Sequence, residues 1–323
     1  MKFGVIGGGA WGTAIAQAMA ADGSAVTLWA REPAVVDAVN GGENAAYLPG
    51  VALSQAIRAT GVLDALRGAD VIFAVTPAQF MRPVLAGLAD ATAPLVLCSK
   101  GIEAGSLKLL HQVARDAVPG APVAVMSGPT FAHEVAAGKP TALTLACEDA
   151  GLAERLAARI ARPGLRPYAS TDVVGAEIGG AVKNVLAIAC GVVEGAGLGQ
   201  NARAALIARG FAEMTRFGLA RGGRAETLAG LSGLGDLVLT CSSVSSRNFS
   251  LGLGLGQGRS ATELLADRRT VAEGAFTAPV LAQAARAAGV DMPVTDAVCR
   301  LLDGAAAGAV IGALLARPLR AEG

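Results

Sequence analysis

The chain has 323 residues, of which 53% are hydrophobic and 16% charged, and its formal net charge is +1. This length accommodates two domains with separate cores. A charge so close to zero excludes the broad positive field that attracts nucleic acid or an anionic membrane surface, so any anion must be bound by local groups.

The termini and the cysteines indicate a cytoplasmic protein. The N-terminus passes straight into a strand and a glycine turn, without the pattern of a signal peptide. The apolar stretch 304–316 is too short to span a bilayer, so we expect a buried C-terminal helix and no stable membrane insertion. The five cysteines lie far apart among apolar residues, which is typical of reduced core thiols in the cytosol.

The first half of the chain alternates short β-rich runs with Ala- and Leu-rich runs of helical length. The candidate strands are residues 3–6, 25–29, 71–75, 95–98, 123–126 and 142–146. This alternation predicts an α/β fold of the Rossmann type, with a doubly wound, mostly parallel sheet covered by helices on both faces. We expect this domain to span residues 1–172. Ligands bind beyond the carboxyl ends of the strands in such sheets.

After residue 172 the β pattern fades and helical patterns replace it. Helices are predicted over residues 176–193, 202–220, 225–229, 261–266, 278–288 and 295–302. Residues 173–323 are therefore expected to form an all-α domain, in which the glycine-rich run 252–258 is interpreted as a mobile turn between helices. A helical domain this apolar suits burial of one face against a second copy, so composition suggests a homodimer.

A glycine fingerprint follows the first strand. Residues 7–12 read Gly-Gly-Gly-Ala-Trp-Gly, which matches GxGxxG, and a helical run of small residues follows. In this setting Gly7 permits the tight turn, Gly9 lets the backbone approach a pyrophosphate, and Gly12 packs helix on strand. N–H groups at the helix N-terminus then hold the anion. The motif favours a dinucleotide-binding domain over a purely structural glycine turn.

The end of the second predicted strand bears on the choice of coenzyme. An acidic residue there accepts a hydrogen bond from the ribose 2′-hydroxyl of NAD, whereas an Arg accommodates the 2′-phosphate of NADP. The chain has Arg31 followed by Glu32. Arg31 favours NADP and Glu32 leaves NAD open; the alternative is an Arg solvated in a loop.

Lys183 is the single charged residue between Glu177 and Glu194, in an apolar and helix-like segment. An ammonium loses solvation there, which is costly unless a partner or a function offsets it. Unlike Arg, a buried Lys can have its pKa lowered until it exchanges protons near neutral pH. The alternative is a Lys whose stem packs on the helix while its head reaches water.

Four further segments carry polar groups in apolar or glycine-rich surroundings. They are residues 96–101, 125–132, 231–239 and 245–248. Taken singly, each has a structural explanation. Lys100 can be a solvated loop end, Asp236 a helix N-cap and Arg247 a residue of a surface loop.

Seven motifs, however, follow one another in a fixed order between residues 7 and 274. They are the glycine fingerprint with Trp11-Gly-Thr-Ala14, Ser99-Lys-Gly101, Ser127-Gly-Pro-Thr-Phe-Ala132, Gly179-Gly-Ala-Val-Lys-Asn184, Gly233-Leu-Gly-Asp-Leu-Val-Leu-Thr-Cys241, Ser246-Arg-Asn248 and Val271-Ala-Glu-Gly274. Together they resemble bacterial NAD(P)-dependent glycerol-3-phosphate dehydrogenase, as does the ending at residues 289–294. The resemblance implies an enzyme that transfers hydride reversibly between NAD(P)H and dihydroxyacetone phosphate. The product, sn-glycerol 3-phosphate, serves phospholipid synthesis.

The resemblance also implies residue roles. Lys183 would be the general acid for the alkoxide in reduction and the base in oxidation, oriented by Asn184 and Asp236. Arg247 and Asn248 would bind the substrate phosphate, where a guanidinium can donate two hydrogen bonds. The implied substrate-binding residues are Lys100, Gly128, Thr130, Lys183, Asn184, Asp236, Ser246, Arg247 and Asn248. The implied coenzyme-binding residues are Gly7, Gly9, Trp11, Gly12, Arg31, Lys100, Ala132, Arg247, Val271 and Glu273.

Some features leave questions open. Residues 249–250 are Phe-Ser where compared members have basic residues, so Arg247 would hold the phosphate with less help. His133 is interpreted as an incidental surface residue without a role. No His, Cys or carboxylate cluster has metal-ligand spacing, so no metal is expected. The pKa of Lys183 stays open, because a nearby carboxylate raises it whereas burial and Lys100 lower it.

Two other functions remain as alternatives. One is another two-domain dehydrogenase, acting on a hydroxyacyl thioester or a keto acid, although Arg247 and Asn248 favour a compact phosphate. The other is a redox sensor that binds NADP(H) without turnover, for which a buried Lys183 is unnecessary.

Overall fold

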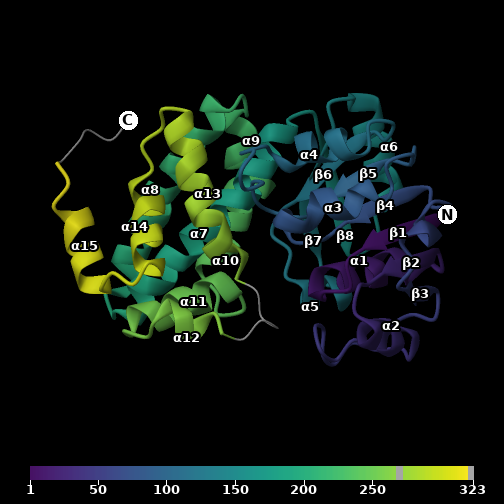
Figure 1. The fold of residues 1–323 in the computed structure, drawn as a ribbon, viewed down its shortest axis with the longest axis horizontal. Coiled ribbons are helices and arrows are strands. Elements are labelled where there is room, and N and C mark those ends of the chain that lie inside the picture. Colours follow the sequence, from purple (N-terminus) through teal and green to yellow (C-terminus); the bar gives the residue numbers. More distant parts are fainter. Residues whose placement is uncertain (267–271, 319–323) are drawn as a thin grey trace. The chain divides into compact units, whose positions relative to one another are not determined.

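The computed structural model describes residues 1–266 and 272–318 of the chain. The chain divides into two compact units, Met1–Glu177 and Ile178–Gly323. Figure 1 shows that the strands belong to the first unit and that the described part of the second is helical. The boundary expected after residue 172 falls where helix α7 (Val173–Gly195) begins, whereas the first unit continues through its first turn to Glu177.

The first unit is built on one eight-stranded sheet, in the order β3-β2-β1-β4-β5-β6-β7-β8. The strands are β1 (Lys2–Ile6), β2 (Ala25–Trp29), β3 (Ile57–Thr60), β4 (Val71–Ala74), β5 (Leu95–Leu97), β6 (Val123–Ser127), β7 (Thr141–Ala146) and β8 (Leu165–Ser170). All neighbours pair in parallel except β6 and β7. The predicted mostly parallel, doubly wound sheet is confirmed, and each of the six predicted strands is present.

The sequence did not predict β3 and β8, which are the two edge strands of the sheet. Their sequences, Ile-Arg-Ala-Thr and Leu-Arg-Pro-Tyr-Ala-Ser, mix buried with exposed positions. A central parallel strand is covered on both faces and reads as a continuous apolar run, as β4 does with four buried residues. An edge strand does not need that pattern and tolerates a proline.

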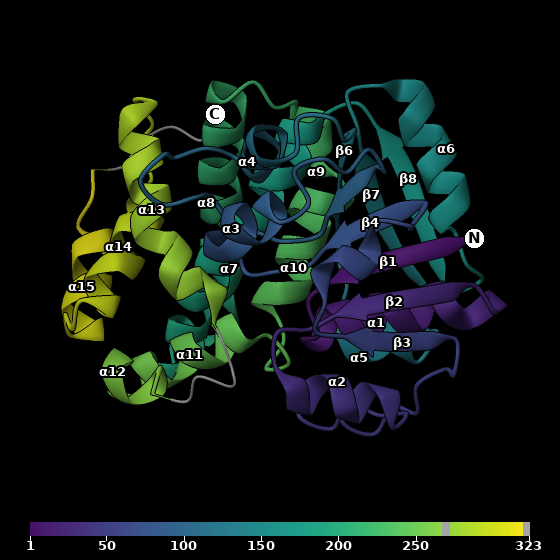
Figure 2. The same cartoon turned by 45° about the vertical axis from the view of Figure 1, so that its right-hand side comes forward.

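Helices cover both faces of the sheet. Buried side chains of α1 (Ala10–Met19), α2 (Pro33–Asn40), α5 (Ala132–Ala136) and α6 (Ala150–Ile160) share one core with alternate strand residues, and those of α3 (Met81–Ala86) and α4 (Leu110–Ala117) share the other. Strand β4 shows the alternation, since Phe73 lies in the first core and Ile72 in the second. Figure 2 shows β1, β2 and β3 side by side, with α2 next to β3.

The second unit is a bundle of helices around α7. The others are α8 (Gly199–Ala220), α9 (Ala225–Ala229), α10 (Asp236–Cys241), α11 (Arg247–Gly256), α12 (Ala261–Leu264), α13 (Glu273–Ala287), α14 (Pro293–Leu302) and α15 (Ala307–Leu315). All six predicted helical segments are present, whereas α10 and α11 were not predicted. Helix α7 is long and apolar enough to cross a membrane, but 94% of its most apolar window is buried inside the protein, as in a core helix.

The interpretation of residues 252–258 as a mobile turn is wrong, because the run lies largely within α11. Its glycines let α11 contact α7 backbone to backbone. A Cβ placed on Gly252 would lie 1.9 Å from the carbonyl oxygen of Ile188, and one on Gly191 would lie 2.1 Å from that of Phe249. Glycine destabilises a helix, and the close packing of α11 on α7 offsets this cost. An argument from local helix propensity does not include such packing.

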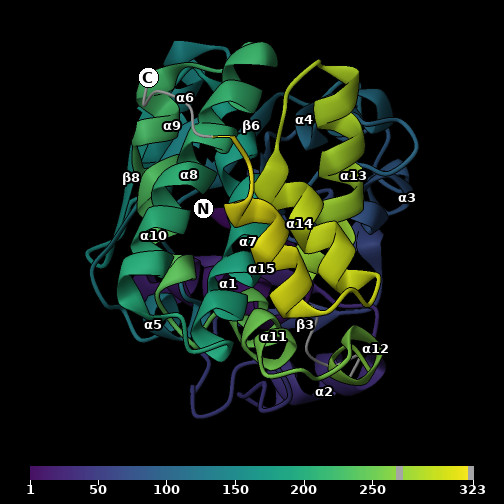
Figure 3. The ribbon, with the colours of Figure 1, turned by 90° about the vertical axis from the view of Figure 1, so that its left-hand side faces the viewer.

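The prediction of a buried C-terminal helix is half right. Residues Ala307–Leu315 form α15, but Val310 is its one buried residue and Leu315 is 81% exposed. Figure 3 shows α14 next to both α13 and α15, and the contacts between these helices agree. Apolar composition alone therefore predicted the helix but not its burial. The cysteines follow the prediction better: all five thiols are free, four are buried, and Cys299 is half-buried.

A buried polar pair fixes the first turn of α7 within the first unit. Nδ1 of His111, on α4, lies 2.6 Å from Oε2 of Glu177, and the backbone N–H of His111 donates to Oε1 at 2.8 Å. Both side chains are at most 5% exposed. Both carboxylate oxygens therefore have partners, which a buried carboxylate needs.

We expect His111→Ala to lower the free energy of unfolding by about 3 kcal/mol, because Glu177 would keep its burial but lose one of its two partners. Chemical denaturation measures this. The matched control is His133→Ala at the other histidine, which is exposed and should change stability by less than about 0.5 kcal/mol. Equal effects of the two substitutions would contradict the expectation.

A second buried carboxylate connects α8 and α14. Glu213 is 2% exposed, and its oxygens accept from the backbone N–H groups of Val294 at 2.7 Å and Thr295 at 3.4 Å, in the first turn of α14. Burial raises the pKa of Glu213 from 4.5 to about 7, although the two N–H donors oppose the shift.

This shift predicts a pH dependence of stability. Between pH 4.5 and 7 the folded state keeps a proton on Glu213 that the unfolded state has lost. The contribution of Glu213 is therefore most favourable below pH 4.5, falls by about 3 kcal/mol as the pH rises to 7, and is constant above. The stability of the wild-type protein minus that of Glu213→Gln, measured by denaturation between pH 4.5 and 8, should follow this curve. A difference independent of pH would contradict it.

Candidate active site

The glycine turn joins β1 to α1 at the carboxyl edge of the sheet. Gly7 has φ +122°, and a Cβ there would lie 2.9 Å from the carbonyl oxygen of Val75; one on Gly12 would lie 1.9 Å from that of Gly7. Gly9 is different. It is exposed, and apart from its chain neighbours no atom of the described residues would lie within 4 Å of a Cβ there. Packing explains the glycines at 7 and 12, whereas open space over Gly9 fits a turn that a pyrophosphate approaches closely.

Other residues predicted to bind the coenzyme also belong to the first unit. Trp11 is in the first turn of α1, and Ala132 is the first residue of α5, which packs against α1. Arg31 follows β2, where its guanidinium lies 3.0 Å from the carboxylate of Glu32 and its side chain is 76% exposed. A 2′-phosphate near Arg31 would compete with this exposed ion pair, which contributes little stability.

Lys100, Gly128 and Thr130 come together after the neighbouring strands β5 and β6. Nζ of Lys100 donates to the carbonyl oxygen of Gly128 at 3.4 Å, and Oγ1 of Thr130 donates to the same oxygen at 3.2 Å. A Cβ on Gly128 would lie 2.8 Å from the Cα of Leu143, so packing requires glycine there. The structure thus brings together three residues that the sequence predicted for the substrate.

In the second unit, Lys183 is 8% exposed and its ammonium is held inside the bundle. Nζ donates to Oδ1 of Asp236 at 2.5 Å and to Oγ1 of Thr240 at 2.9 Å. Asp236 is fully buried, on α10. The alternative of a Lys head reaching water is therefore wrong. The ammonium and the carboxylate compensate each other in a place where either alone would be very costly.

Thr240 was not predicted as a site residue. Its hydroxyl accepts from Lys183 and donates to the carbonyl oxygen of Asp236 at 2.6 Å, so it fixes the ammonium from a second direction. The signal was available: Thr240 lies four residues after Asp236, and side chains at that spacing share one face of a helix.

Close backbone contacts place Asp236 opposite Lys183. A π-helical turn, Leu231–Gly235, leads into α10. A Cβ on Gly179 of α7, one turn before Lys183, would lie 2.3 Å from the carbonyl oxygen of Ser232 in this turn. The glycine lets the two backbones meet, which sets how far Asp236 stands from α7.

The remaining predicted residues cluster where α7, α11 and the start of α13 meet. Oδ1 of Asn248 accepts from the N–H of Gly274 at 2.9 Å, and a Cβ on Gly274 would lie 2.5 Å from the carbonyl oxygen of Asn184. Glu273 is the first residue of α13.

Ser246 caps α11 by accepting from the N–H of Phe249 at 3.3 Å, and Arg247 is exposed in the first turn of this helix. Val271 lies outside the described residues.

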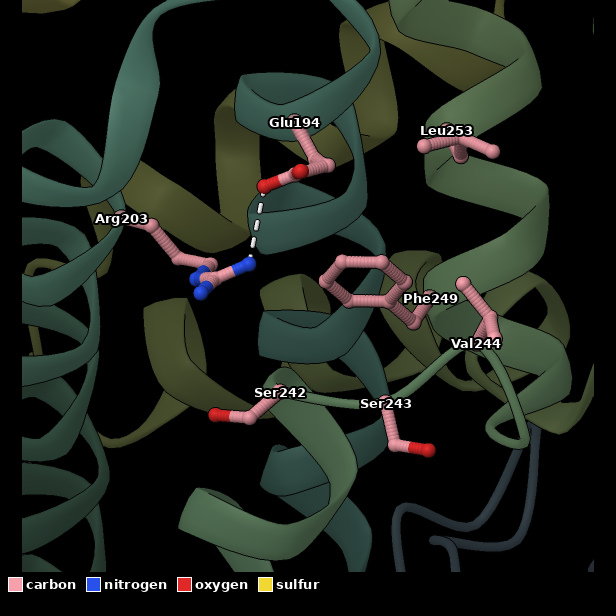
Figure 4. Close-up of a pocket in the computed structure, with 7 residues that line it drawn as sticks. All are labelled: Glu194, Arg203, Ser242, Ser243, Val244, Phe249 and Leu253. Carbon is pink, nitrogen blue, oxygen red and sulfur yellow. Dashed lines mark hydrogen bonds and ion pairs between the residues drawn. The ribbon is translucent and has the colours of Figure 1, made fainter.

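A cavity of about 360 Å³ lies elsewhere in the helical unit. Figure 4 shows its lining residues: Glu194, Arg203, Ser242, Ser243, Val244, Phe249 and Leu253. The guanidinium of Arg203 lies 2.8 Å from the carboxylate of Glu194 and joins α7 to α8 across this space. None of the predicted site residues that the structure describes lines the cavity.

Comparison with known proteins decides the family. Residues 2–153 match the N-terminal model of NAD-dependent glycerol-3-phosphate dehydrogenase, and residues 172–310 match the C-terminal model. The chain belongs to this family. The motif resemblance drawn from the sequence is thereby confirmed.

Individual relatives agree with this assignment. Over its full length the chain is 64% identical to glycerol-3-phosphate dehydrogenase [NAD(P)+] 1 of Sphingopyxis alaskensis, covering 98% of that protein. It is also 64% identical to the Erythrobacter litoralis glycerol-3-phosphate dehydrogenase [NAD(P)+], over 98% of this chain and 97% of the relative. The crystal structure of the Coxiella burnetii glycerol-3-phosphate dehydrogenase superposes with a TM-score of 0.93 at 38% identity, covering 98% of this chain and 99% of that one.

The glycine turn yields a paired prediction. Gly9→Ala should fold with nearly unchanged stability, because the added methyl points into space that the described residues leave open. It should weaken NAD(P)H binding at least about tenfold, because it occupies the approach to the pyrophosphate. Coenzyme titration followed by fluorescence measures the second effect.

The matched variant Gly12→Ala should instead lower stability, by about 2 kcal/mol or more, because its methyl would overlap the Gly7 carbonyl. Thermal melts of both variants test this difference. Normal coenzyme affinity of Gly9→Ala would count against a coenzyme at this turn.

Proposed function

We propose that this chain catalyses reversible hydride transfer between NAD(P)H and dihydroxyacetone phosphate, giving sn-glycerol 3-phosphate, with Lys183 as general acid and base. The observation that carries the proposal is the buried contact of Lys183 with Asp236 and Thr240. We further propose that the enzyme works in the cytoplasm in glycerophospholipid synthesis and that it is a homodimer, as its composition suggests.

The coenzyme, when bound, supplies or accepts the hydride. In reduction, the carbonyl carbon of dihydroxyacetone phosphate gains the hydride and its oxygen becomes an alkoxide, which takes a proton from Nζ of Lys183. In oxidation the neutral amine of Lys183 takes the hydroxyl proton back. A general acid must be protonated before the reaction, and the adjacent carboxylate of Asp236 favours the ammonium form.

Thr240 and Asp236 also restrict the position of Nζ. Two acceptors at 2.5 and 2.9 Å hold the ammonium in one orientation, and we propose that Nζ keeps this orientation when a substrate oxygen approaches it. A proton donor fixed in this way needs no reorganisation when negative charge develops on that oxygen.

The phosphate would bind at the start of α11. Arg247 is exposed there, and a guanidinium suits a phosphate through two parallel hydrogen bonds. The sequence suggested that Asn248 and Ser246 bind the substrate directly. In the structure, Asn248 Oδ1 accepts from the N–H of Gly274, and Ser246 Oγ caps α11. We propose that both chiefly shape the turn, and that Lys100, Gly128, Thr130 and Asn184 complete the substrate site.

The experiment is a steady-state assay of NADPH and NADH oxidation with dihydroxyacetone phosphate, run in parallel, with hydroxyacyl and keto-acid substrates as controls. We expect turnover with dihydroxyacetone phosphate alone, with a preference for NADPH if Arg31 contacts a 2′-phosphate. Coenzyme binding without oxidation by any substrate would favour the sensor alternative.

Two substitutions test Lys183. Lys183→Met keeps the stem but removes the proton donor, and Lys183→Arg keeps the charge beside Asp236 but does not release a proton at neutral pH. Both should lower kcat roughly a thousandfold while leaving the Kd of NAD(P)H within about threefold of wild type. Lys139→Ala, at an exposed lysine paired with Glu134, is the control and should retain activity. Substantial turnover by Lys183→Arg would show that charge, not proton exchange, is what the reaction needs.

A further inference from the structure

The side chain of Asn44 reaches the glycine turn from the segment that follows α2. It is 1% exposed, and its Nδ2 donates to the carbonyl oxygen of Gly8 at 2.9 Å and to Oγ1 of Thr13 at 2.8 Å. The hydroxyl of Thr13 donates to the same Gly8 oxygen at 3.4 Å. The three groups therefore form a closed set of contacts beneath the turn.

Asn44 is itself held in place. Its carbonyl oxygen accepts from the N–H groups of Tyr47 at 3.1 Å and Leu48 at 2.7 Å. Its side-chain Oδ1, in contrast, is buried with no hydrogen-bond partner among the described residues. A flipped amide would turn Oδ1 toward the Gly8 oxygen, acceptor against acceptor. Asn44 thus contacts the turn through its donors alone.

The contact with Gly8 determines the direction of another group. The carbonyl of Gly8 and the N–H of Gly9 belong to one planar trans peptide, in which they point in opposite directions. A donor that holds the Gly8 oxygen beneath the turn therefore holds the Gly9 N–H toward the other side. Gly9 is exposed, precedes α1 and has open space where its side chain would be.

We propose that Asn44 is a positioning residue for the coenzyme: it sets the Gly8–Gly9 peptide so that the Gly9 N–H, rather than the Gly8 carbonyl, faces the pyrophosphate. Thr13 assists by accepting from Asn44 and donating to Gly8. The inference rests on the proposed function, because it needs a dinucleotide at the glycine turn. A glycine peptide has little intrinsic preference between two orientations, so an external donor is effective here.

The decisive substitution is Asn44→Asp. It keeps the shape but replaces the two donors with an acceptor opposite the Gly8 oxygen, which favours the flipped peptide. We expect the Kd of NADPH to rise about tenfold or more, while kcat at saturating coenzyme and KM for dihydroxyacetone phosphate stay within about twofold. Binding of adenosine 2′-monophosphate, which lacks the pyrophosphate, should change by less than about threefold.

A second test variant and a matched control complete the experiment. Thr13→Val preserves volume, removes the hydroxyl, and should raise the Kd of NADPH about threefold; it replaces Asn44→Asp if that variant does not fold. Asn40→Ala is the matched control, because Asn40 lies at the end of α2 and makes two similar hydrogen bonds, to the N–H and carbonyl of Ala59 at 2.9 and 3.0 Å, away from the turn. Its Kd for NADPH should equal that of wild type.

The outcomes separate the inference from the proposed function. A loss of NADPH affinity in Asn44→Asp or Thr13→Val, absent in Asn40→Ala, supports the inference. Unchanged NADPH affinity, equal losses in Asn40→Ala, or an equal loss for adenosine 2′-monophosphate overturns it while wild-type turnover stands. Failure of the wild-type protein to bind NADPH or NADH would overturn the proposed function, and with it the role of Asn44.

Discussion

The helical unit depends on backbone contacts that only glycine permits. Along α7, Gly179 meets the turn before α10, and Gly191 and Gly195 meet α11. These contacts hold Asp236 at the distance where it binds the Lys183 ammonium, and they bring the start of α11 to α7. With side chains between the helices, the axes would lie farther apart and the buried ion pair would lose its geometry.

The buried ion pair of Lys183 with Asp236 and the carboxyl edge of the sheet contribute different properties to the enzyme. Strands β1, β5 and β6 end in short turns that carry the glycine fingerprint, Lys100 and Thr130, and a sheet of this kind places such turns at one edge. The helical unit holds the Lys183 ammonium against Asp236 in a buried setting, where electrostatic interactions are stronger than in water. The α/β unit thus suits the binding of a nucleotide, and the helical unit suits proton transfer.

The sequence predicted the elements whose patterns are local. Strands such as β4 are covered on both faces, so their burial appears directly as an apolar run, whereas the edge strands β3 and β8 mix buried with exposed positions and were missed. The importance of the lysine in an apolar helix could also be predicted from the sequence, because burying an ammonium is costly unless a partner or a function offsets the cost. The packing between elements that lie far apart in the sequence could not be predicted. Neither the glycine contacts of α11 nor the exposure of α15 follows from periodicity.

The glycines of α7 carry a consequence for how this protein can vary. Gly179 and Gly191 have no side chain that could take part in a reaction, yet the smallest possible addition at either would overlap a neighbouring carbonyl oxygen. Exposed positions of the same domain, such as Leu315, accept many side chains. We therefore expect inactivating substitutions in a deep mutational library to concentrate along these glycines of α7 and the residues they contact, as densely as around Lys183. Tolerance to mutation at a position would then depend on how close it lies to these helix–helix contacts rather than on its distance from the substrate.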